Sequence, residues 1–179
     1  MPARRAEDDD RGATVFRAGS GPAARGGTSR ADVVVSDKEI DYPKAMGLDI
    51  LLAMNQMACD ESADELKPAG LLVVDSHLVS QVTYPRTVRI PFTKIAREKC
   101  GREQMANIVA LGALSRLIPI TPLGTGVVTL EAMEAAVMAR IPKGTETQNK
   151  QAFDEGVKAA EEVQKSLVFE TPVEESDQI

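Results

Sequence analysis

The sequence has few of the residues that build cofactor and nucleic-acid sites. Its 179 residues include no Trp, one His and two Cys, and aromatic residues make up only 3% of the chain. Single-stranded nucleic acid is bound largely by stacking bases on aromatic side chains, so this composition argues against that function. Acidic residues outnumber basic ones by 27 to 21, giving a net charge of −6, which argues against a broad basic surface for duplexes. We therefore expect no nucleic-acid partner.

Cysteines and long apolar runs are also scarce. Neither Cys59 nor Cys100 belongs to a CxxC pair, so this chain alone does not provide the ligands of a cysteine-bound zinc ion or iron–sulfur cluster. The apolar stretches are interrupted well before the roughly 18 residues that a membrane span needs. No secretory signal precedes the cysteines, so we expect reduced thiols, a cytoplasmic location and no membrane association.

The two ends of the chain differ from its middle. Residues 1–12 contain an acidic run and show no apolar periodicity, which predicts a disordered leader. Residues 168–179 are typical of an acidic, solvated tail. The length suits one domain of ordinary size, so we predict a single α/β domain over residues 13–167.

Apolar runs alternate with helical patterns along this middle part. The sequence predicts strands at Ala13–Phe16, Ala31–Val35, Leu48–Met54, Leu71–Asp75 and Thr87–Pro91. It predicts helices at 56–66, 93–99, 105–117, 130–141 and 147–167, with 67–70 as a helix breaker. The unit of two buried strands around helix 56–66 is near the minimum length of a parallel crossover. The fold class is therefore α/β, a layered domain with a mostly parallel central sheet and a helical C-terminal half.

A glycine-rich loop follows the first predicted strand. Residues 19–24 match the dinucleotide fingerprint GxGxxG/A, but Gly26 and Gly27 oppose the helix that this fingerprint requires, which argues against a nicotinamide-binding fold. In a second interpretation the paired glycines turn backbone amides toward an anion, while Arg25 adds a charged fork for carboxylate or phosphate. The plain alternative is an exposed turn with an incidental arginine. The residues alone leave both open.

Two polar groups follow predicted strands. Asp75, Ser76 and His77 are of catalytic-triad types, but neighbouring side chains at a strand end do not converge, so a polar loop explains them better. Asn55 and Gln56 follow the strand 48–54, at the edge where open α/β sheets bind ligands. A helix cap is the simpler account of Asn55. We assign no catalytic residue and no metal ligand.

Several segments, taken in order, resemble the gamma subunit of 2-oxoacid:ferredoxin oxidoreductases, most closely the 2-oxoglutarate type. The segments are GPAARGGTSRADVVVSD at 21–37, IDYP at 40–43, LAMNQ at 52–56, LLVVDS at 71–76, PFTKIA at 91–96, ANIVALGAL at 106–114 and PKGTE at 142–146. The resemblance runs from about residue 19 to about residue 161. No single motif decides it, but their order and spacing together are specific to the family.

The resemblance implies a role in a complex. Enzymes of this family decarboxylate a 2-oxoacid on thiamine diphosphate, pass electrons through iron–sulfur clusters to ferredoxin and form an acyl-CoA. It implies alpha and beta subunits as partners, with a delta subunit as a further option, and cofactors held by those partners rather than by this chain alone. It places the ligand-facing loop at Gly21, Pro22, Arg25, Gly26, Gly27 and Ser29. Asn55 and Gln56 are proposed as polar site residues because of their position at a strand end.

The chain departs from the family pattern at its start. Family members begin with a strand and a GxGGQG turn upstream of this loop, and residues 1–17 contain no such motif. This predicts either a truncated gamma subunit or a diverged one. The alternative function is a scaffold or ligand-binding module without enzymatic activity that kept the fold.

Overall fold

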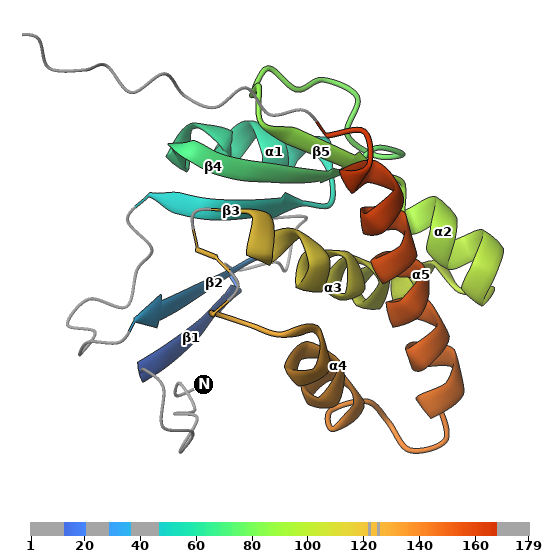
Figure 1. Ribbon diagram of the computed structural model, residues 1–179. Helices are drawn as coiled ribbons and strands as arrows, with labels where there is room; N and C mark the ends of the chain where they lie inside the picture. Colours follow the sequence, from blue (N-terminus) through green and yellow to red (C-terminus); the bar gives the residue numbers. More distant parts are fainter. Residues whose placement is uncertain (1–12, 21–28, 37–46, 122, 125, 168–179) are drawn as a thin grey trace, which may run out of the picture. The chain divides into compact units, whose positions relative to one another are not determined.

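The computed structural model describes residues 13–20, 29–36, 47–121, 123–124 and 126–167 (Figure 1). The chain divides into two compact units, residues 1–48 and 49–179. The predicted leader and tail lie outside the described residues. The expectation of one domain over 13–167 stays a prediction, and each unit is described by itself.

The first unit is a β-hairpin. Strand β1 (Ala13–Ser20) pairs antiparallel with β2 (Ser29–Ser36), in a register that sets Ala13 opposite Ser36 and Ser20 opposite Ser29. Both predicted strands are present, and β1 is longer than expected. In β2 the alternation of exposed Val33 and Val35 with half-buried Val34 shows the two-residue period of a strand.

The second unit contains a three-stranded sheet in the order β3-β4-β5 (Figure 1). β3 (Leu48–Ala53) leads through α1 (Gln56–Ser62) and the short 3-10 helix η2 (Ala63–Glu65) into β4 (Leu66–Asp75). β5 (Thr87–Ile90) pairs in parallel with β4. The predicted α/β class with a mostly parallel sheet is confirmed.

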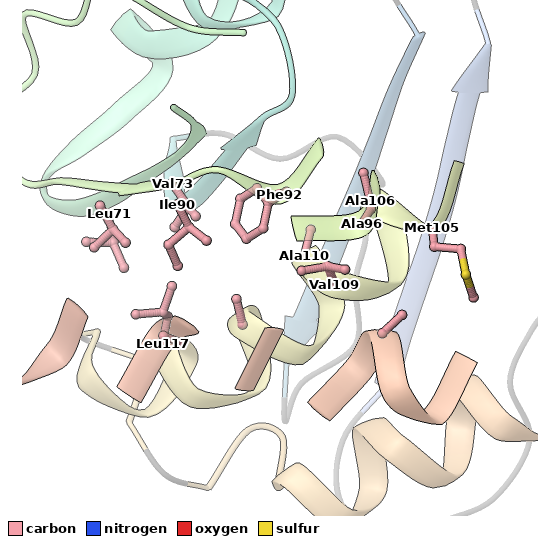
Figure 2. Close-up of a cluster of buried hydrophobic side chains, with 14 residues drawn as sticks. Leu71, Val73, Ile90, Phe92, Ala96, Met105, Ala106, Val109, Ala110 and Leu117 are labelled. Atoms are coloured by element: carbon pink, nitrogen blue, oxygen red, sulfur yellow. The ribbon is translucent and has the colours of Figure 1, made fainter. Parts of the chain in front are cut away.

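Strand β4 is covered on both faces, which explains its uninterrupted apolar sequence. Leu71 and Val73 point into the larger core, which the helices of the C-terminal half line (Figure 2). Leu72 and Val74 point to the opposite face, where they pack with Ala53, Cys59 and Val79. Alternation along one strand thus supplies both cores.

The C-terminal half is helical, as predicted. It consists of α2 (Phe92–Cys100), η3 (Glu103–Met105), α3 (Ala106–Leu117), η4 (Ile118–Ile120), α4 (Leu130–Met138) and α5 (Glu146–Gln164). The boundaries fall within three residues of the predicted ones. α4 and α5 are tied by Lys150, whose ammonium lies 3.1 Å from a Glu134 carboxylate oxygen and also pairs with Asp154. The Asp154 hydrogen bond raises the pKa of Lys150.

The predicted breaker at 67–70 is wrong, because these residues form the first half of β4. The helix before it is also shorter than predicted, ending at Ser62. Pro68 lacks an amide hydrogen, which a central strand does not normally tolerate. It is accommodated because β5 pairs only with residues 72–75 of β4, so no described strand lies beside the exposed Pro68 on that side. The Tyr84 hydroxyl donates a 2.6 Å hydrogen bond to the Lys67 carbonyl at this open stretch.

Helices α3 and α5 approach each other at two glycines. A Cβ atom on Gly112 would overlap the Phe153 carbonyl, and one on Gly156 would overlap the Val109 carbonyl and lie 3.0 Å from the Ala113 amide nitrogen. The two helices therefore pack backbone against backbone.

Candidate functional site

The glycine-rich loop joins the ends of the hairpin. Gly21, Pro22, Arg25, Gly26 and Gly27 lie outside the described residues, whereas Ser29 is the first residue of β2. Ser20 and Ser29, which flank the loop, are register partners. β1 is thus followed by an antiparallel strand rather than by a crossover helix and a parallel strand, so the GxGxxA match is not part of a dinucleotide-binding unit. The anion-binding role of the loop stays a prediction.

Asn55 is the N-cap of α1. Its backbone is extended and its side-chain oxygen accepts a 2.8 Å hydrogen bond from the Ala58 amide. This satisfies one of the amides that a helix leaves without a partner in its first turn. The cap interpretation of Asn55 is confirmed, and contact with a ligand stays a prediction.

Gln56 holds the loop that follows β4. Its side-chain oxygen Oε1 accepts hydrogen bonds from the backbone amides of Ser80 and Gln81, at 3.0 and 3.1 Å. Its amide nitrogen donates to the Gln81 carbonyl at 2.9 Å and to an Asp60 carboxylate oxygen at 2.8 Å. Both amide hydrogens are therefore used within the chain. Nothing in the sequence near Gln56 indicated this contact, because its partners lie 24 and 25 residues further on.

We expect Gln56→Ala to loosen this loop without unfolding the sheet. Losing the side-chain acceptor leaves the Ser80 and Gln81 amides unbound, at a local cost of about 1.5 kcal/mol. Hydrogen exchange at these two amides should accelerate about tenfold, while exchange in β4 is unchanged. Asp60→Ala is the control, since it removes only the bond to the Gln56 amide nitrogen. Equal exchange rates in Gln56→Ala and the wild type would contradict this role.

Asp75 connects the end of β4 to the start of α2. Its side chain is fully buried and accepts hydrogen bonds from the Thr93 amide at 2.9 Å and from the Thr93 hydroxyl. Its other oxygen accepts from the His77 backbone amide at 2.9 Å, not from the imidazole. His77 is exposed. The three triad-type residues therefore do not converge, which confirms the polar-loop interpretation over a triad.

The cysteines are not arranged for chemistry. Burial raises the pKa of both thiols. Cys59 is a buried residue of α1, and Cys100 is the last residue of α2. Both thiols are free, and a raised pKa lowers the fraction of reactive thiolate.

Within the ranges the structure describes, no three His, Cys, Asp or Glu residues gather as a metal site, so these residues do not fit an iron–sulfur cluster. No helix in the same ranges has the length and apolar character to cross a bilayer.

Comparison with known proteins defines the class. Residues 12–159 match the family model described as pyruvate ferredoxin/flavodoxin oxidoreductase, and the chain belongs to this family. It is similar to the 2-oxoglutarate synthase subunit KorC of Methanocaldococcus jannaschii, with 44% identity over 147 residues that cover 80% of this chain and 75% of the relative.

A solved structure narrows the assignment further. The gamma subunit of a keto/oxoacid ferredoxin oxidoreductase from Geobacter sulfurreducens matches with a TM-score of 0.68 and 38% identity, over 84% of this chain and 82% of that one. The 2-oxoglutarate:ferredoxin oxidoreductase of Magnetococcus marinus, at 23% identity and a TM-score of 0.66, covers 89% of this chain and 27% of that one and supports the fold alone. The predicted resemblance to gamma subunits is confirmed, as is the prediction that the chain is part of an oxidoreductase.

Proposed function

We propose that this chain is the gamma subunit of a thiamine diphosphate-dependent 2-oxoacid:ferredoxin oxidoreductase. The complex converts a 2-oxoacid and CoA into an acyl-CoA and CO2, and the electrons released reduce ferredoxin. The observation that carries this proposal is the 44% identity to a 2-oxoglutarate synthase subunit over four fifths of the chain. In this proposal the alpha and beta subunits hold thiamine diphosphate, and the iron–sulfur clusters sit on cysteine-rich segments of the partners.

We further propose 2-oxoglutarate as the substrate and the cytoplasm as the location. The loop at 21–30 reads GPAARGGTSR, as in the 2-oxoglutarate type, whereas pyruvate-type gamma subunits tend toward GPERRGAPV. Substrate contacts belong mostly to the partner subunits, so the loop sequence indicates which 2-oxoacid the enzyme uses but does not itself determine substrate specificity.

Reconstitution tests this function. The chain is purified alone and together with the alpha and beta subunits of the same genome, and each preparation is assayed with CoA, an electron acceptor and one of three substrates: 2-oxoglutarate, pyruvate or a branched-chain 2-oxoacid. We expect turnover only by the complex and fastest with 2-oxoglutarate. Turnover by the chain alone would contradict the subunit role, and much faster turnover of another 2-oxoacid would contradict the substrate.

Within that complex, we propose that Arg25 binds a phosphate or carboxylate of CoA or of the 2-oxoacid. A guanidinium can bind such a group through two hydrogen bonds, and glycines on one side let the backbone come close to it. Arg25→Ala should raise KM for one of the two substrates by roughly 10- to 100-fold, the effect of losing about 1.5–3 kcal/mol from a charged hydrogen bond. Arg17→Ala, outside the loop, is the control. If Arg25→Ala prevents assembly of the complex, while the small amount that does assemble has the wild-type KM, Arg25 is an interface residue and does not bind a ligand.

A further inference from the structure

An open hollow lies where α4 ends and α3 and α5 begin. Its volume is about 730 Å³, and all of it belongs to the second unit. Its wall comes from the segment before α3, the first turn of α3, the connection between α4 and α5, and the first turn of α5. Figure 1 shows this connection running from the end of α4 to the start of α5. The strand-end residues Asn55 and Gln56 do not line it.

The charge of the hollow has one sign. Arg102 and Arg140 line it and no carboxylate does, in a chain with a net charge of −6. Gly101, with a φ of 71°, ends α2 in the left-handed conformation, and Arg102 follows it in an extended conformation. Arg140 follows α4, and its guanidinium donates a 3.1 Å hydrogen bond to the Ala136 carbonyl. The backbone thus places both cations at helix ends.

These two arginines retain their capacity to bind an acid. Among the described residues neither forms an ion pair, whereas Arg116 pairs with Glu161 at 2.9 Å. The nearby Glu146 carboxylate is turned to the Gly144 amide, which it contacts at 3.0 Å. A guanidinium has five donors, and one hydrogen bond leaves most of those of Arg140 unused.

Apolar side chains form much of the less exposed lining of the hollow, and exposed amide side chains form its rim. Met105, Ile108 and Ile141 supply apolar surface, and Gln104, Asn107 and Gln148 supply groups that both donate and accept hydrogen bonds. Protein interfaces typically have an apolar centre and a polar rim, and they are enriched in Arg and Met and depleted of Asp and Glu. Small-molecule sites enclose most of their ligand, whereas this hollow is open.

We propose that this hollow docks an acidic segment of a partner subunit, in which an apolar side chain flanked by Asp or Glu enters between Arg102 and Arg140. The apolar side chain covers Met105 and Ile141, the carboxylates pair with the guanidinium groups, and the rim amides bond the segment's backbone. This inference rests on the proposed function, since it takes the partner from the same oxidoreductase. It assigns an assembly surface to the second unit.

Charge reversal tests the docking. The chain is titrated against the co-purified alpha and beta subunits, and its affinity is measured by biolayer interferometry at about 50 and about 500 mM salt. The double variant Arg102→Glu/Arg140→Glu should bind about 100-fold more weakly at the lower salt, because like charges then face each other. Arg97→Glu is the control for reversing a cation elsewhere, at an exposed arginine of α2 that does not line the hollow, and it should bind as the wild type does.

A cross-link locates the contact without depending on charge reversal. Benzophenone introduced by Gln148→p-benzoylphenylalanine should cross-link, in the wild-type background, to a partner peptide that carries Asp or Glu beside an apolar residue. A cross-link to a segment without acids, or affinity of the double reversal equal to that of Arg97→Glu, would overturn the inference and leave the proposed function standing. Normal assembly with a raised KM for CoA would make the hollow a small-anion site and overturn it as well. A wild-type chain that does not bind the two subunits would overturn the proposed function, and the docking with it.

Discussion

Gly156→Ala is expected to lower the free energy of unfolding by about 3 kcal/mol, the upper part of the range for overpacking a filled core. A Cβ atom at this position overlaps the Val109 carbonyl, which belongs to helix backbone and has no rotamer by which to move aside. Helices α3 and α5 must therefore separate, opening the larger core between them. For a chain of this length the melting temperature should fall by roughly 6–12 °C.

The sign of this effect makes the experiment decisive. In an isolated helix the same substitution is favourable by about 1 kcal/mol, because alanine is the better helix former. Gly112→Ala should behave like Gly156→Ala, since its Cβ atom overlaps the Phe153 carbonyl. Gly126→Ala is the control, because a Cβ atom there meets nothing within 4 Å, and its melting temperature should stay close to that of the wild type. Unchanged or raised melting temperatures for both helical variants would show that the close approach is not required.

Asp75→Ala is expected to cost about 3 kcal/mol of unfolding free energy, because it leaves buried donors without an acceptor. The Thr93 amide, the Thr93 hydroxyl and the His77 amide all lose their partner in this variant. Asp75→Asn should cost less, about 1–2 kcal/mol, since an amide oxygen still accepts from Thr93 but the negative charge near the start of α2 is gone. Urea unfolding of the purified chain measures both.

Asp64→Ala provides the comparison for this series. Asp64 is exposed in η2 and lies outside both cores, so its removal should change the unfolding free energy by less than about 0.5 kcal/mol. One outcome of the Asp75→Ala measurement would assign this carboxylate to ligand binding instead of stability. If Asp75→Ala unfolded at the same urea concentration as the wild type while the assembled complex lost turnover, the carboxylate would act on a ligand rather than as a connection between β4 and α2.

Much of the second unit was predictable from local patterns. The apolar run at 71–75 predicts a strand covered on both faces, and the stripe along 147–167 predicts α5 to within three residues at either end. Asn55 is recognisable as a helix cap because capping depends on residues three apart in the chain. The family was recognisable too, since it depends on the order of residues and on nothing that folding adds.

The features missed depend on partners far along the chain. Residues 67–70 have the composition of a breaker, and they form a strand because β5 stops short of Pro68. The sequence around Gln56 does not indicate that its side chain binds the loop at 80–81, because the contact depends on residues 24 and 25 positions away. Arg102 precedes α3 and Arg140 follows α4, so both helices lie between them in the chain, and only helix packing brings them to one hollow. Local propensity and residue order were enough to predict most of the helices and strands and the family, but not the first half of β4. The tertiary structure alone decided the close helix crossing, the loop anchor and the cationic hollow, because each is a contact between segments whose separation no short-range pattern encodes.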